Sequence, residues 1–213
     1  MRYHKIPDET VRRLPIYLRG LTVSADQGSE RISSQALADF VGVNPWQIRK
    51  DFSYFGDFGT PGVGYHIEKL TKEIKKILRL DVIRKAALVG VGDLGSALLA
   101  YPGFRAYGLD IAAAFDVDPK KVGKAVNGIE IEDMTRIDTL RQRDISLAIV
   151  AVPRTAAQLV VDTLVAAGVR GILNFAPCKL SAPKRVKITT LDIAMELARL
   201  PYYIPRMDQV VIT

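Results

Sequence analysis

The sequence predicts an α/β protein in which a small helical domain precedes a doubly wound parallel sheet. Near residue 80 the pattern changes from helical apolar spacing to short β-branched or alanine-rich runs that alternate with helical patterns. A basic helical stretch before this change runs into the glycine-studded segment GDFGTPGVGY, and an apolar run after it leads into GVGDLG. We expect domains over residues 1–80 and 81–190, followed by a C-terminal helical segment over residues 191–213.

Composition limits the class of protein. The chain has 213 residues, of which 48% are hydrophobic, so a sizeable core is expected. The single cysteine, Cys178, excludes an internal disulfide. No apolar run approaches the roughly 18 residues that span a bilayer, and the first residues lack the apolar core of a signal peptide. We therefore expect a cytoplasmic protein. The net charge of +7 permits a polyanionic partner without demanding one.

The first predicted helix starts at Pro7, which suits a first helical turn. Pro15 lies inside its pattern, where proline is expected to kink or split a helix. The apolar face of this helix is predicted to consist of Val11, Leu14, Leu18 and Leu21. A second short helix follows, with Ser33 or Ser34 as its N-cap and Gly42 at its end. The buried stripe of this second helix is predicted to consist of Ala36, Leu37, Phe40 and Val41.

A third helix opens at Asn44 as N-cap, with Pro45 in its first turn, so that the second and third helices form a helix-turn-helix. Ile48 and Phe52 lie four residues apart and anchor one side of the third helix to the core. Basic and hydrogen-bonding groups occupy its other sides, which suits the major groove of DNA. The alternative is a solvated helix face that carries a surface tryptophan.

The segment after this helix predicts the wing of a winged helix. Phe55, Phe58, Val63 and Tyr65 can form short paired strands, and the glycines between them allow tight turns and a close approach to a sugar-phosphate edge. The alternative is a hairpin that only caps the small core. The predicted DNA contacts are Asn44, Trp46, Arg49, Lys50, Ser53, Tyr54, Phe58, Gly59 and Thr60. An amphipathic connector helix over HIEKLTKEIKKILRL ends this domain.

Three glycines after the strand predicted over residues 86–89 match the fingerprint of a Rossmann-like dinucleotide site. Gly90 makes the turn, Gly92 lets a pyrophosphate approach the backbone, and Gly95 allows close helix–strand packing. Asp116 ends the next strand, 21 residues past Gly95, where an acid accepts hydrogen bonds from a ribose diol and disfavours a 2′-phosphate. This favours NAD(H) over NADP(H), although Lys120 and Lys121 lie close by. The alternative is a strand–turn–helix with incidental glycines.

Three further runs, ISLAIVAVP, GILNFAP and VKITTLD, complete the predicted sheet, whose carboxyl edge binds ligands in folds of this class. The residues at the ends of the first two runs are candidates for the nicotinamide side, or they only shape the loops. The predicted contacts of the coenzyme, NADH or NAD⁺, are Gly90, Val91, Gly92, Asp93, Leu94, Gly95, Asp116, Val117, Asp118, Val152, Pro153, Asn174, Phe175 and Ala176.

No pattern in the sequence supplies a catalytic centre, and we predict neither catalytic residues nor a metal site. His4 and His66 fall outside the nucleotide domain, and Cys178 has no histidine near it in sequence. Tyr101, Lys179 and Asp192 lie in no recognisable catalytic motif. Ligand binding without turnover fits better than an enzyme. The alternatives are an NAD-dependent oxidoreductase with an appended helical domain, and a winged-helix regulator that senses another nucleotide such as coenzyme A.

The chain resembles the Rex family of bacterial NADH-sensing transcriptional repressors. The matching stretches are QIRKDFSYFGDFGTPGVGY, LVGVGDLGSALLAYPGF, FDVDPKKVG, AVPRTAAQ, AAGVRGILNFAP and LDIAMELARLPYYI, in the family's order. The resemblance implies a homodimer with NAD(H) near its interface and a C-terminal helix, about Leu191 to Tyr203, exchanged between subunits. It also implies that NADH releases the repressor from a palindromic operator, whereas NAD⁺ permits DNA binding.

The resemblance further implies a switch between the domains formed by Arg19, Tyr101 and Asp192, and it adds Tyr101 to the expected coenzyme contacts. The genes that such repressors control typically serve NADH reoxidation and fermentation. One departure concerns the wing, where Rex proteins often carry a basic residue and this chain has Thr60-Pro61. Operator affinity is therefore expected to depend more on Arg49, Lys50 and helix N-termini than on the wing.

Overall fold

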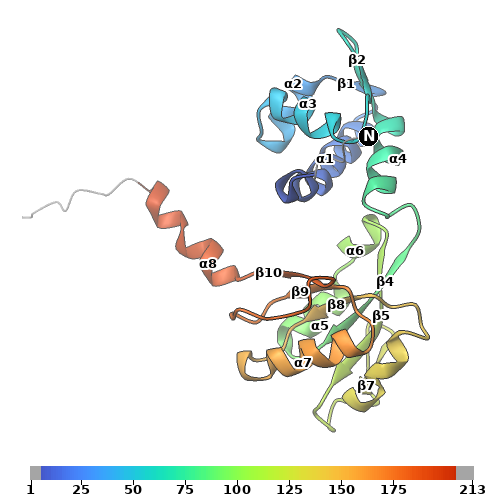
Figure 1. Cartoon of the computed structure of the whole chain (residues 1–213), viewed down its shortest axis with the longest axis vertical. Helices are drawn as coiled ribbons and strands as arrows, with labels where there is room; N and C mark the ends of the chain where they lie inside the picture. The colour runs from blue at the N-terminus through green and yellow to red at the C-terminus, as the bar shows by residue number, and fades with distance from the viewer. Residues whose placement is uncertain (1–5, 205–213) are drawn as a thin grey trace, which may run out of the picture. The chain divides into compact units, whose positions relative to one another are not determined.

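The structure, a computed structural model, describes residues 6–204 and divides the chain into two compact units with the boundary between Ile83 and Arg84 (Figure 1). We call them the N-terminal unit and the C-terminal unit. The N-terminal unit contains α1 (Asp8–Asp26), β1 (Arg31–Ile32), α2 (Ser34–Val41), α3 (Pro45–Ser53), β2 (Gly59–Thr60), β3 (Gly64–His66) and α4 (Ile67–Ile77). The three strands form an antiparallel sheet in the order β1-β3-β2.

Helix α1 runs unbroken through Pro15, so the expectation that this proline splits the helix is wrong. Proline lacks only one donor of the helix, and the exposed Pro15 side chain meets solvent rather than a neighbouring element. The buried face includes Leu14, Leu18 and Leu21 as predicted, but Val11 is 40% exposed. Thr10 is buried in its place, because its hydroxyl faces a polar group of α3 rather than the apolar core.

Helix α2 begins and ends as its sequence predicts. Ser33 accepts a hydrogen bond from the Ala36 amide, and Gly42 adopts a left-handed conformation with φ of 71°. The buried stripe differs from the prediction, because Leu37 and Ala38 are buried whereas Ala36 and Phe40 are exposed. Gly20 of α1 explains the shift: a Cβ there would lie 2.9 Å from the Leu37 side chain, so the two helices cross at this point.

The wing forms a hairpin and the connector helix is present, but of the four residues expected in the paired strands of the wing only Tyr65 lies in a strand. Strands β2 and β3 pair through Gly59↔Tyr65 and Thr60↔Gly64, and β1, which the sequence did not predict, extends the sheet on the other side of β3. A side chain at Gly64 would strike the backbone of Ile32 in β1, so this glycine is required for the third strand to pair. Helix α4 buries its predicted face against the unit through Ile67, Leu70 and Ile74.

The C-terminal unit is built on a seven-stranded sheet. Its elements are β4 (Arg84–Val89), α5 (Asp93–Ala100), α6 (Gly103–Ala106), β5 (Leu109–Asp116), β6 (Ala125–Val126), β7 (Ile129–Asp133), η1 (Met134–Leu140), β8 (Leu147–Val150), α7 (Arg154–Ala166), β9 (Gly171–Asn174), β10 (Lys187–Thr190), α8 (Ile193–Ala198) and η2 (Leu200–Tyr203). The strand order is β10-β9-β8-β4-β5-β7-β6, and only β6 runs antiparallel to its neighbour. The predicted Rossmann-like fold is confirmed.

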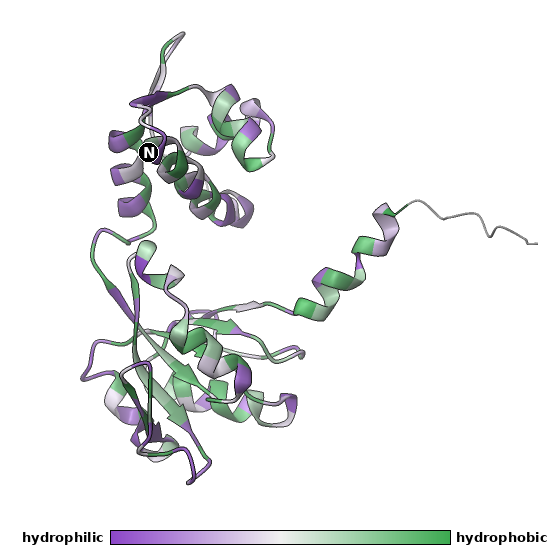
Figure 2. Cartoon of the chain, turned by 180° about the vertical axis from the view of Figure 1, so that it is seen from behind, coloured by the Kyte–Doolittle hydropathy of each residue, from purple (hydrophilic) through white to green (hydrophobic). Residues whose placement is uncertain are grey.

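The sheet separates two layers of core, as the alternation along its strands requires. Ala87 and Val89 face the cluster that includes α7 and η1, whereas Leu88 between them faces the cluster that includes Leu99 of α5. The central strands are accordingly mostly apolar, with charged residues toward their ends (Figure 2). The strand order reverses at β4 and β8, and the carboxyl ends of these two strands therefore border the crevice where such sheets bind ligands.

The last described elements, α8 and η2, are exposed along their length. Asp192 caps α8 by accepting hydrogen bonds from the amides of Ala194 and Met195. Apolar side chains such as Met195, Leu197 and Tyr202 are among the most exposed of the described residues. Exchange of this segment between subunits stays an expectation, and its predicted end at residues 205–213 lies outside the described residues.

Candidate functional site

The glycine loop between β4 and α5 has the geometry of a dinucleotide cradle. Gly90 has a φ of 95°. A Cβ at this position would lie 2.6 Å from the carbonyl oxygen of Ala151, which directly follows β8. A Cβ at Gly95 would collide with the carbonyl oxygen of Gly90, so this glycine holds α5 close to β4. A Cβ at Gly92 would meet nothing within 4 Å. The space beside Gly92 is therefore open at the N-terminus of α5, which favours an anion.

Asp116 ends β5 beside this loop and is 7% exposed. Its carboxylate accepts hydrogen bonds from the Val91 amide at 2.8 Å, the Asp118 amide at 2.9 Å and the Lys121 ammonium at 3.1 Å. Burial by itself raises the pKa of Asp116, but the two amides and Lys121 outweigh it, so the pKa lies below its usual value. A carboxylate offers about four acceptor positions, so one remains for a further donor.

A cavity of about 350 Å³ joins the glycine loop, Asp116 and the end of β8. Its lining residues are Val89, Gly90, Gly92, Asp116, Val117, Lys121, Met134, Ala151, Val152, Pro153, Ala156 and Val160. Six of the predicted coenzyme contacts thus meet here: Gly90, Gly92, Asp116, Val117, Val152 and Pro153. Sequence reasoning missed Met134, for which no local signal exists, and the pair Ala156 and Val160, whose spacing of four places them on one face of α7.

Other predicted contacts lie away from this cavity. Asn174 is fully buried, and its amide group donates to the Ala176 carbonyl and the Thr190 hydroxyl while accepting from the Ala176 amide. It therefore shapes the loop after β9, and Ala176 is buried with it. Phe175 packs against the core cluster on the α5 side of the sheet. Whether Asn174 and Ala176 also contact the coenzyme stays a prediction.

The remaining predicted contacts belong to the first turn of α5 and to the turn after β5. Asp93 and Leu94 are exposed beside Gly92. Val91 is buried, and its backbone amide donates a hydrogen bond to the Asp116 carboxylate. The Asp118 carboxylate accepts from the Lys120 amide and so closes the turn after β5. Tyr101 follows the far end of α5, where its ring packs edge-on against Phe104 at 5.3 Å. Tyr101 does not line the cavity at the glycine loop, and its expected contact with the coenzyme stays a prediction.

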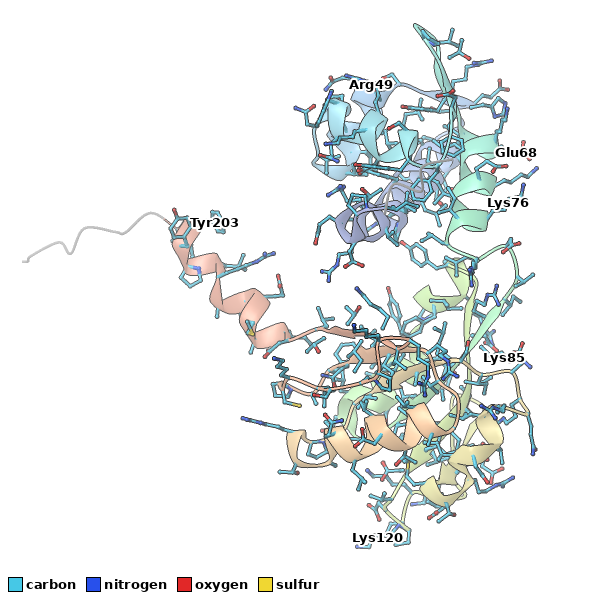
Figure 3. The ribbon with its side chains drawn as sticks, viewed as in Figure 1. Arg49, Glu68, Lys76, Lys85, Lys120 and Tyr203 are labelled. Carbon is cyan, nitrogen blue, oxygen red and sulfur yellow. The ribbon has the colours of Figure 1, made fainter. Side chains whose placement is uncertain are left out.

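A second candidate site lies in the N-terminal unit, on α3. Asn44 caps this helix by accepting from the Trp46 amide at 2.8 Å, as predicted. Ile48 and Phe52 are buried, whereas Arg49, Lys50 and Ser53 are exposed. The Lys50 ammonium lies 4.8 Å from the centre of the Trp46 ring, a cation–π contact that fixes both side chains on the same surface. Arg49, which is labelled in Figure 3, donates a hydrogen bond of 2.7 Å to the Ser34 hydroxyl at the start of α2.

A groove of about 520 Å³ separates α3 from the wing. Five predicted DNA contacts line it: Arg49, Ser53, Phe58, Gly59 and Thr60. The other four predicted DNA contacts lie outside this groove: Trp46 and Lys50 on α3, and Asn44 and Tyr54 at its two caps. Sequence reasoning missed Ser33 and Ser34, which also line it. Phe58 is half-buried, and its ring packs edge-on against Phe52, so it supports the wing in addition to bordering the groove.

The residue of α3 that sequence reasoning missed altogether is Asp51. It is fully buried and carries five hydrogen bonds from four side chains. Burial by itself raises the pKa of Asp51, but the hydrogen bonds from Arg13, Tyr17, Gln47 and Thr10 outweigh it and lower the pKa. An acid in a basic, solvent-facing helix gives no local signal of burial, because the partners of Asp51 are mostly some 40 positions away on α1.

The three residues of the expected switch are placed as follows. Arg19 is exposed on α1, Tyr101 is 57% exposed after α5, and Asp192 caps α8.

Within residues 6–204, no group of three or more His, Cys, Asp or Glu side chains is arranged to hold a metal ion. Over the same range, no helix combines the length and apolar character needed to cross a membrane.

Family models match both parts of the chain. A model described as a putative DNA-binding protein N-terminus matches residues 5–53, and a model described as a CoA binding domain matches residues 81–178. Redox-sensing transcriptional repressor Rex of Lactobacillus gasseri is 44% identical, covering 94% of this chain and 94% of its own length. The protein of the same name from Chloroflexus aggregans is 43% identical, covering 95% and 96% respectively.

Solved structures of similar proteins match over both units. The crystal structure of RSP in complex with NAD⁺ and operator DNA has a TM-score of 0.86 at 33% identity, covering 93% of this chain and 92% of that one. The crystal structure of RSP in complex with NADH has a TM-score of 0.84 at 31% identity, covering 93% and 94%. RSP is described as a Rex-family repressor.

Proposed function

The chain belongs to the Rex family of redox-sensing transcriptional repressors, and we propose that it is a repressor whose operator binding responds to NADH. The observation that carries this proposal is the pairing, in one chain, of a groove between a basic α3 and a wing with a cavity formed by a glycine loop and Asp116. The curated relatives are named repressors rather than enzymes, which supports binding without turnover.

The cavity of the C-terminal unit would hold the coenzyme. Gly92 leaves room for a pyrophosphate at the N-terminus of α5, and Asp116 retains an acceptor for a ribose hydroxyl. Oxidised nicotinamide carries a positive ring charge that reduction removes. Apolar walls such as Val152 and Met134 disfavour the cation, so NADH is expected to bind more tightly than NAD⁺.

The groove of the N-terminal unit would take the edge of an operator duplex. Arg49 and Lys50 supply positive charge on α3, and the paired strands of the wing reach alongside. We further propose a cytoplasmic homodimer, since an inverted-repeat operator requires two such helices in twofold symmetry. Because the coupling between two ligands is reciprocal, NADH must lower the affinity for DNA by the same factor as DNA lowers the affinity for NADH.

A titration of an inverted-repeat duplex tests the proposal. The duplex is selected from random-sequence DNA with the ligand-free protein, and its affinity is then measured with NADH, NAD⁺ or coenzyme A. We expect NADH to lower the affinity by tenfold or more, which corresponds to about 1.4 kcal/mol, and NAD⁺ to have little effect. Equal affinity with and without saturating NADH would overturn the proposal.

Coenzyme A belongs in the titration because residues 81–178 match the CoA binding domain model. A regulator that senses this nucleotide is the second candidate function. Both ligands contain an adenosine nucleotide, so the open N-terminus of α5 suits either. Release by coenzyme A but not by NADH would favour the second candidate.

Removal of the two charges on α3 tests the DNA surface. We expect Arg49→Ala combined with Lys50→Ala to weaken binding and to reduce the slope of log affinity against log salt by about 2, because each phosphate contact adds about 0.9 to that slope. Glu68→Gln on α4 removes an exposed negative charge in the same unit, where the Glu68 carboxylate forms an ion pair with Lys72. It serves as a control that should leave the slope unchanged. An unchanged slope in the double variant would remove both residues from the phosphate contacts.

A further inference from the structure

The most strongly bonded side chain of the N-terminal unit does not face the groove. The carboxylate of Asp51 accepts from the Arg13 guanidinium at 2.6 and 2.9 Å, the Tyr17 hydroxyl at 2.6 Å, the Gln47 amide at 2.7 Å and the Thr10 hydroxyl at 3.0 Å. Three of these donors come from α1, whereas Asp51 and Gln47 belong to α3. We call Asp51, Arg13, Tyr17, Thr10 and Gln47 the Asp51 network.

The Asp51 network has the right place to set the rotation of α3. Neighbouring residues of an α-helix are about 100° apart, so Arg49 and Ser53 lie about 160° from Asp51 around the axis. The side that Asp51 holds against α1 is thus opposite the side that borders the groove. Ile48 and Phe52 also anchor α3, but apolar contacts are less directional than hydrogen bonds and tolerate a small rotation of the helix.

Hydrogen bonds to a buried carboxylate do not tolerate such a rotation. Each requires a donor within about 3 Å and near-linear geometry, and five of them on one carboxylate fix its position from several directions. Fully satisfied buried networks of this kind select one arrangement of the surrounding elements. Leaving a buried charge without its partners is strongly unfavourable, so small departures from this arrangement are also disfavoured.

We propose that the Asp51 network positions the recognition helix, so that Asp51, Arg13, Tyr17 and Thr10 determine operator preference without touching DNA. This inference rests on the proposed function, since it concerns the same DNA surface. Tyr17 is fully buried, and Thr10 is 1% exposed, so neither can reach a duplex. Base readout requires side chains placed to within fractions of an ångström, whereas phosphate attraction acts over longer distances. Loosening α3 should therefore reduce selectivity more than it reduces general DNA affinity.

The test compares two single-hydroxyl deletions in α1. Thr10→Val removes the hydrogen bond to Asp51, whereas Thr22→Val removes a hydroxyl that donates to the Leu18 carbonyl within α1. Tyr17→Phe removes a second donor to Asp51 and keeps the edge-on ring contact with Phe52. None of these changes alters the net charge of the full-length protein. Affinity is measured for the selected inverted-repeat duplex and for a scrambled duplex of equal length and composition.

We expect Tyr17→Phe to lower the ratio of selected to scrambled affinity about tenfold, Thr10→Val to lower it less, and Thr22→Val to leave it unchanged. Affinity for the scrambled duplex should change less than twofold in all three. Thermal unfolding of each variant is followed by the fluorescence of Trp46, the single tryptophan of the chain, and binding is measured well below each midpoint. A purely structural role would lower the midpoint of Tyr17→Phe and leave the ratio unchanged, which would overturn the inference.

Failure of the inference differs from failure of the proposed function. If the chain is not an operator-binding repressor, the wild-type protein itself shows no preference for any selected duplex. If only the inference fails, the wild type retains its preference and Tyr17→Phe retains it equally. Loss of both specific and non-specific binding by Tyr17→Phe at a temperature where its fold is intact would also count against a positioning role, because it would indicate a direct effect on the DNA surface.

Discussion

Among the residues that the structure describes, each unit buries one aspartate, but the two carboxylates are held in different ways. In the N-terminal unit, side chains from two helices supply every hydrogen bond to Asp51, and no part of the residue is exposed. In the C-terminal unit, two backbone amides and Lys121 bind Asp116, which borders a cavity. Asp51 therefore connects elements to one another, whereas Asp116 is attached to its own strand end and the neighbouring glycine loop.

The difference shows how a buried charge can serve structure or binding. A carboxylate whose acceptor positions are all used by the protein has nothing left for a ligand, and its contribution is the fixed geometry of its partners. The Asp116 carboxylate is held mainly by two backbone amides, with Lys121 as its one side-chain partner, and one acceptor position can face a ligand. Both have a lowered pKa, so the direction of the pKa shift alone does not distinguish the two roles.

The largest expected effect is on stability. Asp51→Asn leaves the Arg13 guanidinium without its anion, and it places the new NH₂ group of the asparagine next to donors that the carboxylate had accepted from. We therefore expect the free energy of unfolding of the N-terminal unit to fall by about 3–5 kcal/mol. Asp116→Asn should cost the C-terminal unit about 1 kcal/mol, because an amide oxygen still accepts from backbone amides. Chemical denaturation followed by Trp46 fluorescence and by circular dichroism separates the two units. Equal losses in both variants would break the comparison.

The pH dependence of stability follows from the same carboxylate. The pKa of Asp51 is lower in the fold than in the unfolded chain, where it is about 3.9. The unfolded state therefore binds more protons, and the stabilisation by Asp51 is present above about pH 4 and is lost as the pH falls through the folded pKa. Denaturation of the N-terminal unit at a series of pH values should show this loss in the wild type. The exposed-site variant Asp39→Asn should retain it, whereas Asp51→Asn should show a flatter profile.

Two glycine substitutions test whether the cavity beside Asp116 binds a ligand. Gly95→Ala places a methyl group against the Gly90 carbonyl, and we expect it to destabilise the C-terminal unit by about 2–3 kcal/mol. Gly92→Ala meets nothing in the protein and has an ordinary extended backbone, so it should leave stability within about 0.5 kcal/mol. Its methyl group would occupy the space beside the N-terminus of α5. Thermal unfolding and NADH calorimetry on both variants check this, and undiminished NADH binding by a folded Gly92→Ala would contradict it.

The last expected effect is smaller than the stability losses at Asp51 and Gly95, and it concerns the coenzyme. Asp116→Ala removes the acceptor for a ribose hydroxyl and frees Lys121, so we expect NADH binding to weaken about tenfold, or about 1.4 kcal/mol. DNA binding by the ligand-free protein should be unchanged, because Asp116 belongs to the other unit. Calorimetry with NADH and a duplex titration without coenzyme measure the two effects. A variant that responds to NADH as the wild type does would show that Asp116 does not bind the ribose.

Much of the local structure was predictable from short patterns. The caps at Ser33, Gly42 and Asn44 and the turn at Gly90 follow from residue types whose backbone or side-chain chemistry acts within a few positions. The buried stripe of α2 was not, because Gly20 of another helix decides which face is covered. The hydrogen bonds of Asn174 were also not predictable. Its side-chain amide donates to the Ala176 carbonyl and the Thr190 hydroxyl, and only the fold brings these groups together.

The sequence by itself determined the main helices and strands in their order, the winged helix, the doubly wound sheet and the glycine loop, but not the short strands β1, β6 and β7. Each depends on periodicity or on residues close together in the chain, and local sterics and apolar spacing are read directly from such patterns. Only the tertiary structure decided that Asp51 is a buried anchor, that Lys121 pairs with Asp116, and that Tyr101 lies apart from the cavity. These facts depend on which distant groups meet, and the free energy of a charged side chain is set by those partners rather than by its neighbours in sequence.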